Sequence, residues 1–206
     1  MPPGPSVVSS STSLPALREE YLSLWARAHL RPERATAATN LARLLWASRE
    51  RYERAGAPFR VPWQVVAIIH SLEGGGSRGD FTRHLHNGDP LTARTVNVPR
   101  GKPATGSPPF TWEASASDAL ARFAAWSDWS LPGTLYQLER YNGMGYRIRV
   151  SPPVPSPYLW SWTTVYERGK FVRDGVYDPT AVSAQCGAGA LLKAMEGARL
   201  VPAYST

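Results

Sequence analysis

The segment from Pro62 to Glu73 constrains the fold more than any other part of the chain. Pro62 is suited to open a helix at its first turn, and three consecutive glycines, Gly74 to Gly76, end the predicted helix abruptly. Apolar side chains occur nearly all round it, so the helix must lie inside a core rather than on a surface. The sequence therefore predicts a fold built around one central buried helix that carries an acidic residue at its C-terminal end.

Further helices are predicted on both sides of this one. Apolar residues recur at helical spacing from Leu14 to Ala28, and a second helix is predicted from Pro32 to about Arg54, ended by Gly56 and Pro58. Three more are predicted at 112–126, with Thr111 as N-cap, at 131–141 and at 179–195, whereas 100–109 and 151–178 are expected to be irregular. The alternating, β-branched segment Thr92–Val98 predicts one arm of a small hairpin. We expect an α+β fold that is mainly α-helical with a small β-hairpin.

The chain is expected to form one domain. Residues 1–13 are rich in Pro and Ser and predict a disordered tail, and residues 14–206 are enough for a single domain with a substantial core. Cys186 is the only cysteine, so no intrachain disulfide is possible and a buried thiol is expected. No apolar stretch reaches the roughly 18 residues that span a membrane, and no signal-peptide pattern is seen. We expect a monomer that is made in the cytoplasm and is not stably inserted in a membrane.

The net charge of +7 indicates attraction to polyanions. Nucleic acid and the phosphate-rich bacterial envelope are both polyanionic. The basic residues are scattered, with no run of five or more and no recognisable nucleic-acid-binding motif. The sequence therefore favours the anionic envelope as a partner over nucleic acid.

Glu73 is the first candidate for catalysis. Val66 and Ile69 lie seven and four residues before it, so they share its helix face. Desolvation by apolar neighbours and the negative end of the helix dipole should both raise the pKa of its carboxyl. A group of this kind can protonate the leaving oxygen of a glycosidic bond. The alternative is a solvated helix end beside a glycine loop.

The polar segment His84–Thr95 is the second candidate. It begins with residues that are typical of a turn and continues with a strand pattern. A turn without a role in catalysis is the alternative interpretation. Asp89 could supply a second carboxylate, and Thr92 or Thr95 could position a water. His70, Glu73, His84, His86 and Asp89 are metal-ligand types, but the zinc-protease helix motif lacks its second histidine here. We predict no metal and no cofactor.

Two aromatic segments are further candidates. Tyr141, Asn142 and Gly143 end a predicted helix, and Asn142 could donate to and accept from an N-acetyl group, although the pattern also suits an ordinary helix stop. The irregular stretch 156–162, which includes Trp160, could form a cleft wall or cover the core.

Several longer strings resemble a family of bacterial and phage lysozyme-like proteins, over roughly residues 15–195. They are Ile-Ile-His-Ser-Leu-Glu (68–73), His-Leu-His-Asn-Gly-Asp-Pro-Leu-Thr-Ala-Arg-Thr-Val (84–96), Pro-Pro-Phe-Thr-Trp-Glu (108–113), Leu-Glu-Arg-Tyr-Asn-Gly-Met-Gly-Tyr-Arg (138–147), Ser-Pro-Tyr-Leu-Trp-Ser (156–161) and Gly-Lys-Phe-Val-Arg-Asp-Gly-Val-Tyr (169–177). The resemblance implies a lysozyme-like fold in which a glutamate, here Glu73, ends a buried helix at a cleft crossed by a β-hairpin. The 141–143 string is similar to the Tyr-Asn segment that lines the cleft of goose-type lysozymes and lytic transglycosylases.

The resemblance implies an endolysin-like muramidase that cuts the β-1,4 bond between N-acetylmuramic acid and N-acetylglucosamine in peptidoglycan. Glu73 would be the general acid, with Asp89 or Thr92 assisting a water or the developing charge. The expected sugar-binding residues are His84, His86, Asn87, Thr95, Tyr141, Asn142, Gly143, Tyr146 and Trp160. Such an enzyme would reach the wall after holin-type release or lysis. A lytic transglycosylase, a metal-dependent amidase or peptidase and a non-catalytic wall-binding protein remain alternatives.

Overall fold

The computed structural model describes residues 8–204 and divides the chain into two compact units. One unit consists of Met1–Asn40 with Asp128–Thr206, and the other of Leu41–Ser127. The fold is mainly helical with one small antiparallel sheet, as the α+β expectation requires. Residues 1–7 of the expected tail lie outside the described residues.

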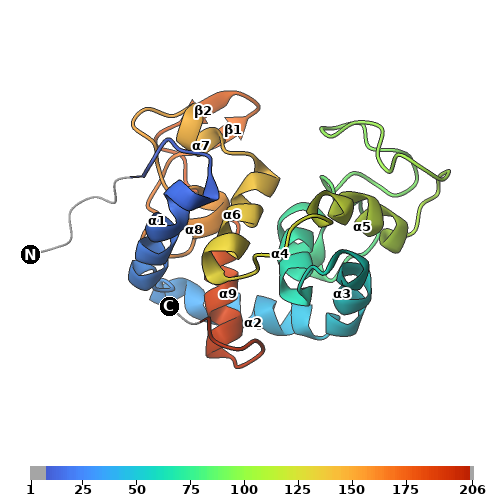
Figure 1. The fold of residues 1–206 in the computed structure, drawn as a ribbon, viewed down its shortest axis with the longest axis horizontal. Coiled ribbons are helices and arrows are strands. Elements are labelled where there is room, and N and C mark those ends of the chain that lie inside the picture. The colour runs from blue at the N-terminus through green and yellow to red at the C-terminus, as the bar shows by residue number, and fades with distance from the viewer. Residues whose placement is uncertain (1–7, 205–206) are drawn as a thin grey trace, which may run out of the picture. The chain divides into compact units, whose positions relative to one another are not determined.

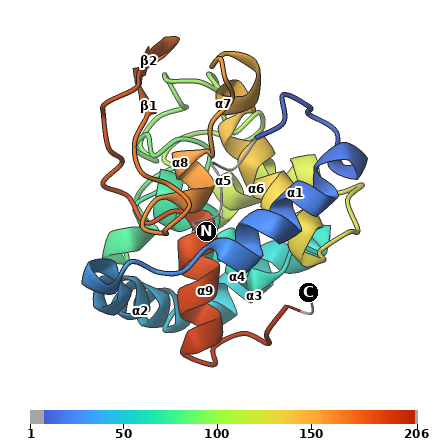
Figure 2. The ribbon, with the colours of Figure 1, turned by 90° about the vertical axis from the view of Figure 1, so that its left-hand side faces the viewer.

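The first unit is built on two helices that pack against each other, α1 (Leu14–Arg27) and α6 (Leu131–Asn142) (Figures 1 and 2). Ser130 caps α6, because its side chain accepts a hydrogen bond from the Gly133 amide. The short α8 (Pro157–Trp160) and the C-terminal α9 (Ala188–Gly197) complete the helical core. The bounds predicted from sequence for α1 and α6 are confirmed to within one residue at each end.

The same unit contains the short helix α7 (Gly145–Ile148) and the sheet, which is the hairpin of β1 (Lys170–Arg173) and β2 (Val176–Asp178). Phe171 pairs with Tyr177, and their rings stack edge-to-face with Tyr146 of α7. Gly175 completes the turn at a φ of 72°, a left-handed conformation that glycine adopts without strain.

The second unit is built around α4 (Trp63–Glu73), which is buried from Val65 to Ser71 as its sequence predicts. It packs against α3 (Arg49–Gly56), and α5 (Trp112–Leu120) packs on α3. Gly56 lets the end of α3 lie close to the segment just before α4, because a Cβ at this position would lie 2.3 Å from the Val61 carbonyl oxygen. Short 3-10 turns complete the unit, at η1 (Ala57–Phe59), η2 (Gly76–Arg78) and η3 (Ala121–Phe123). Thr111 caps α5 as expected, by accepting from the Ala114 amide.

The single helix predicted from Pro32 to about Arg54 is wrong. The chain instead forms α2 (Pro32–Trp46), turns through Ala47 and Ser48, and restarts as α3 with Ser48 at its N-cap. The break turns Tyr52 into the core, where it is fully buried, and leaves Leu44 40% exposed. Both were expected on one buried face, so the turn changes which residues share a face.

The predicted strand at 92–98 is also wrong, because the structure has irregular backbone there and places its hairpin at 170–178. The helix predicted from 112 ends as an α-helix at Leu120. The helix predicted from 179 begins only at Ala188. At the predicted start the chain forms a local turn instead, in which the Asp178 carboxylate accepts hydrogen bonds from the amides of Thr180 and Ala181.

A buried ionic cluster joins α1, α6 and α7 inside the first unit. The Arg147 guanidinium donates hydrogen bonds to both carboxylate oxygens of Glu139 and to Glu20, and Tyr21 donates its hydroxyl to Glu139. Arg147 also donates to the carbonyl of Ser9, whose amide donates to Glu20. The described end of the expected tail is therefore fixed to the helices, although it has no regular secondary structure.

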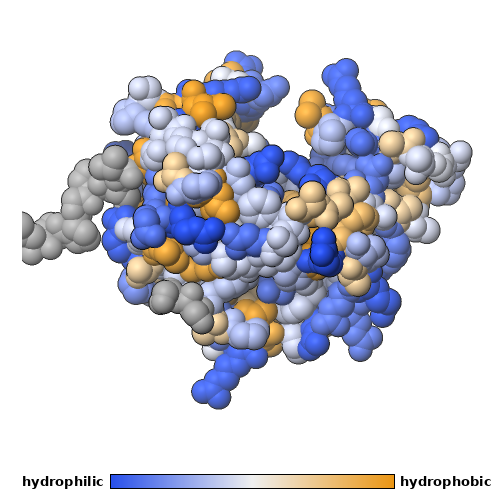
Figure 3. All heavy atoms as spheres, viewed as in Figure 1, coloured by the Kyte–Doolittle hydropathy of each residue, from blue (hydrophilic) through white to orange (hydrophobic). Residues whose placement is uncertain are grey.

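The single thiol is buried, and the surface carries dispersed basic residues. Cys186 is buried and unpaired, as expected. Hydrophilic side chains project from much of the face shown in Figure 3. The exposed arginines are spread over many segments and include Arg54, Arg78, Arg100, Arg122, Arg149 and Arg168. No helix among residues 8–204 is both long and apolar enough to cross a bilayer.

Candidate functional site

Glu73 is the last residue of α4, and its side chain is half-buried. Val66 and Ile69, the residues that share its helix face, are fully buried. Gly74 ends the helix by donating its amide to the His70 carbonyl. The helix thus carries a carboxyl group from the core to the surface of the second unit.

The turn 84–89 packs directly on this end of α4. A Cβ on Gly88 would lie 2.3 Å from the Glu73 carbonyl oxygen, and one on Gly74 would lie 3.3 Å from the His84 carbonyl oxygen. Gly88 also has a φ of 76°. A side chain at position 88 is therefore excluded both by the backbone conformation and by contact with Glu73. The structure places Glu73 beside the polar turn with which the sequence associates it.

Asp89 holds the loop that follows this turn. Its carboxylate is buried and accepts hydrogen bonds from the amides of Val96 and Asn97 and from the side chains of Asn97 and Asn87. Burial alone would raise the pKa of this carboxyl, but the donors of Asn97 and Val96 lower it below its usual value. Asp89 is thus an ionised, fully engaged group that fixes the backbone.

Thr95 and Asn87 fix the same loop, whereas Thr92 faces solvent. The Thr95 hydroxyl donates to the Pro99 carbonyl and accepts from the Lys102 amide. The Asn87 amide donates to the carbonyl of Asn97 as well as to Asp89. Of the predicted site residues in this loop, Thr92 is exposed, Asn87 is half-buried, and Thr95 and Asp89 are buried.

The histidines of the turn are bound to the protein interior. His84 is fully buried and donates from Nε2 to the Ala93 carbonyl, which leaves Nδ1 to accept from the Ser115 hydroxyl. His86 is bonded through Nε2 to Asp118, which also accepts from the Ala104 amide. Both histidines therefore brace the loop 87–104 against α5.

Ser115, His86 and Asp118 have the composition of a hydrolase triad, with 3.5 Å between the Ser115 oxygen and His86 Nδ1. Ser115 is completely buried and accepts the Leu85 amide. A nucleophile must reach its substrate, so this cluster serves the fold.

His70 is buried beneath the Glu73 end of α4. Its Nε2 donates to the Asp80 carbonyl, so its Nδ1 accepts the hydroxyl hydrogen of Tyr52 at 2.9 Å. Desolvation lowers the pKa of His70 to about 4. The ring is therefore neutral at pH 7, and both of its nitrogens hold structure in place.

We expect the second unit to lose stability in mild acid because of His70. The folded pKa is about 4 and the ordinary value is 6.5, so the unfolded chain binds more protons between these limits and stability falls as the pH falls through them. The full loss is about 3 kcal/mol for a shift of this size. Denaturant titrations at about pH 7 and about pH 4.5 will measure most of this loss, which is complete only below about pH 4.

His70→Gln should flatten this pH dependence, whereas His29→Gln, at an exposed histidine of the other unit, should leave it intact. An equal slope in His70→Gln and the wild type would show that another group carries the effect.

A metal site at these residues finds no support in the geometry. Across residues 8–204, no group of three or more His, Cys, Asp or Glu side chains comes close enough to hold an ion. The ring nitrogens of His70 and His84 are already engaged with protein groups.

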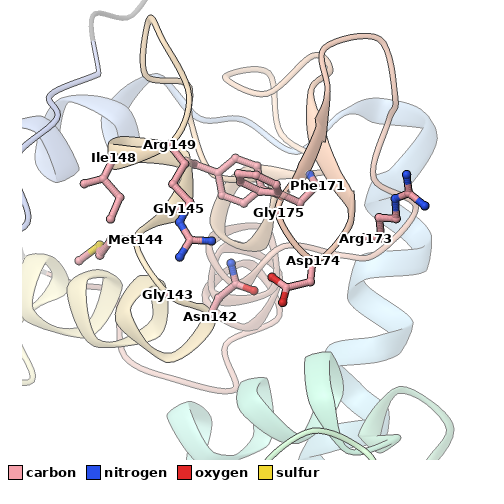
Figure 4. A pocket seen from close by; sticks show the side chains of 11 residues that line it. Asn142, Gly143, Met144, Gly145, Ile148, Arg149, Phe171, Arg173, Asp174 and Gly175 are labelled. Carbon is pink, nitrogen blue, oxygen red and sulfur yellow. Dashed lines mark hydrogen bonds between the residues drawn. The ribbon is translucent and has the colours of Figure 1, made fainter. Parts of the chain in front are cut away.

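The other predicted residues lie in the first unit, where a pocket of about 340 Å³ opens between the end of α6, the helix α7 and the β1–β2 hairpin (Figure 4). Asn142, Gly143 and Tyr146 line it, as do Arg149, Phe171 and Asp174. The Arg149 guanidinium, the Asn142 amide and the Asp174 carboxylate point into the same space. The pocket thus offers donors and acceptors in front of an aromatic wall.

The geometry assigns different tasks to the aromatic residues that the sequence indicates. Tyr146 is buried, and its hydroxyl accepts the Phe171 amide, so it holds the hairpin to α7. Trp160 is buried against α9, where a Cβ on Gly189 would lie 3.1 Å from its ring. Tyr141 is half-buried. Trp160 therefore belongs to the core, while Asn142 and Gly143 are exposed at the pocket.

Sequence reasoning missed the hairpin side of the pocket, Phe171 and Asp174. A signal was available, because Asp174-Gly175 between two β-prone segments is a strong hairpin pattern. The proline-rich surroundings at 152–157 favoured an irregular interpretation. Arg149 carries no such signal, because only the position of the hairpin brings it into a pocket.

Comparison with known proteins does not assign the chain to a family. No protein-family model, no curated protein and no solved structure matches it. The two features of the chain that bear on function are the Glu73 helix end in one unit and the polar pocket in the other.

Proposed function

We propose that this protein is a peptidoglycan glycosidase that cleaves the β-1,4 bond between N-acetylmuramic acid and N-acetylglucosamine, with Glu73 as general acid. The proposed substrate is a neutral polysaccharide backbone within an anionic wall, to which a chain of net charge +7 is attracted. Glycoside cleavage needs a proton at the leaving oxygen, which a carboxylic acid supplies.

The observation that carries the proposal is the position of Glu73. It emerges half-buried from the most buried helix of its unit and lies against a turn that is locked in place. Asp89, His84 and Thr95 fix the loop after this turn by hydrogen bonds. A rigid setting of this kind holds a proton donor at a fixed position, which is what general acid catalysis requires.

The polar pocket at Asn142 supports the same substrate class. An amide, a guanidinium and a carboxylate are planar groups that each bind two polar partners, and sugar hydroxyls and N-acetyl groups present such partners in pairs. Gly143, at a φ of 89°, leaves the backbone uncovered beside them. We propose that Asn142, Arg149 and Asp174 hold sugars, and that Tyr146 supports them.

The second catalytic group separates two versions of the mechanism. The carboxylate of Asp89 is engaged by backbone and side-chain donors, so it is poorly placed to attack or to activate water. A lytic transglycosylase uses the acid without a second carboxylate and forms 1,6-anhydro ends. The engagement of Asp89 therefore favours a lytic transglycosylase as the second candidate function. The hydrolytic route would instead use a water positioned by the exposed Thr92.

The test is the chemistry of the fragments released from purified peptidoglycan by the full chain. We expect soluble glycan fragments, with reducing ends from hydrolysis or 1,6-anhydro ends from transglycosylation, which mass spectrometry separates. Preincubation with EDTA should leave the rate unchanged. Release of free peptides, or loss of activity in EDTA, would replace the proposal with an amidase or a peptidase. Binding without release would leave a wall-binding protein.

A further inference from the structure

A second pocket, of about 250 Å³, lies in the first unit and shares no residue with the pocket at Asn142. Residues from the start of α2 and from the irregular segments after α8 line it, among them Arg31, Arg34, Glu33, Trp162, Glu167 and Val182. Its volume is below the roughly 300–1,000 Å³ of pockets for drug-sized ligands. The pocket therefore suits a ligand of about one ring.

Trp162 is held in this pocket in an unusual backbone conformation. Its φ is 70°, in the left-handed region that a bulky residue rarely adopts. The surroundings stabilise it there: its carbonyl accepts the Arg31 amide, and its indole nitrogen donates to the Ala184 carbonyl. A glycine would adopt this φ without strain. Strained residues of this kind cluster at functional sites, and here the strain positions an indole ring at the pocket.

The ring is half-buried, with the exposed Arg34 guanidinium 5.2 Å from its centre. An exposed arginine can move to admit another group. Arg31 is already anchored, because it donates to the Tyr166 carbonyl. The pocket thus combines one fixed guanidinium, one adjustable guanidinium and an aromatic surface.

The charges of the pocket indicate the class of ligand. The lining contains two arginines, Arg31 and Arg34, and two glutamates, Glu33 and Glu167, so it has no excess of either sign. Such a set does not select an anion or a cation, but it provides both donors and acceptors. A sugar ring meets these conditions, because it is neutral, places C–H groups on one face and carries polar groups round its edge.

We propose that this pocket is an accessory glycan-binding site that takes one N-acetylhexosamine residue of a β-1,4-linked strand against Trp162. The choice of sugar rests on the proposed function, whereas the existence of a neutral-sugar site rests on the pocket alone. The site would hold the strand independently of bond cleavage, since none of its residues is among those proposed for catalysis.

The test is an NMR titration of the full chain, labelled at its tryptophan indoles, with the β-1,4-linked trimer of N-acetylglucosamine. The indole resonance of Trp162, identified by its absence in Trp162→Gly, should shift saturably. Trp162→Gly should bind insoluble peptidoglycan about tenfold more weakly, as expected for loss of a central aromatic contact. Arg34→Gln, at an exposed position, should weaken the trimer titration while the melting temperature stays unchanged.

Arg199→Gly is the matched control. Arg199 also has a left-handed φ, 58°, in the same unit but outside the pocket, so this change relieves strain without removing the ring. It should leave binding intact. An indole resonance of Trp162 that does not move, while peptidoglycan is still cleaved, would overturn the accessory site and leave the proposed function standing. A saturable shift of this resonance in a chain that does not cleave peptidoglycan would support the accessory site and overturn the proposed function.

Discussion

Replacing Glu73 with glutamine is expected to slow the clearing of purified peptidoglycan by about 10²–10⁴-fold, the usual contribution of a general acid. Glutamine preserves the size of the side chain and its ability to form hydrogen bonds, but its amide cannot deliver a proton to a leaving oxygen. The helix that carries Glu73 is buried, and the hydrogen bond between Tyr52 and His70 holds it from within the core. We therefore expect an unchanged melting temperature together with a lost rate, measured by turbidity.

Glu113→Gln provides the matched control in the same unit. Glu113 is an exposed glutamate at the first turn of α5, paired with Arg51. Its replacement should cost little stability, as is usual for surface ion pairs, and should leave the clearing rate at the wild-type level. If Glu73→Gln and Glu113→Gln cleared peptidoglycan equally fast, the mechanism based on Glu73 would be wrong.

Replacing Arg147 with methionine is expected to destabilise the first unit by about 3–5 kcal/mol, the cost typical of removing one partner from a buried ion pair. Glu139 would remain almost fully buried as a charged group. It would lose the hydrogen bonds from Arg147 and keep the one from the Tyr21 hydroxyl. Ser9 and Glu20 would lose their link to α7 at the same time. Denaturant titration measures the loss.

The double variant Arg147→Met with Glu139→Gln separates the buried charge from packing. Glutamine removes the charge and still accepts from Tyr21, so a large part of the lost stability should return. Arg18→Met is the comparison at the surface, because Arg18 and Asp128 are both substantially exposed, and it should cost less than about 1 kcal/mol. A double variant no more stable than Arg147→Met would show that packing, not charge, sets the cost.

The helices predicted best are those whose local signals agree. Pro62, the apolar run and three glycines specify α4 within its own segment. The cap at Thr111 and the bounds of α6 follow from equally local patterns. The break at 47–48 contains no proline or glycine, so the apolar pattern predicts one helix that continues across it. This places Leu44 on the buried face, whereas it is 40% exposed.

The site was only partly predictable, because residue types indicate chemistry but not access. The sequence identifies Asp89, His84 and Thr95 as polar groups of one segment, yet in the structure they are engaged by groups of their own loop and of α5. Hydrogen-bonding side chains serve a turn and a ligand equally well, so sequence alone does not separate the two roles.

What the sequence by itself determined is the central helix and its acidic end, because these depend on neighbours within a few residues. The contact between this helix end and the turn 84–89 comes from the tertiary structure. Only the tertiary structure decided which polar groups remain available. It engaged Asp89 in its loop, buried Arg147 against Glu139, and brought Asp174 to the pocket at Asn142. Such pairings join segments far apart in the chain, and their energies depend on burial, which a local pattern does not contain.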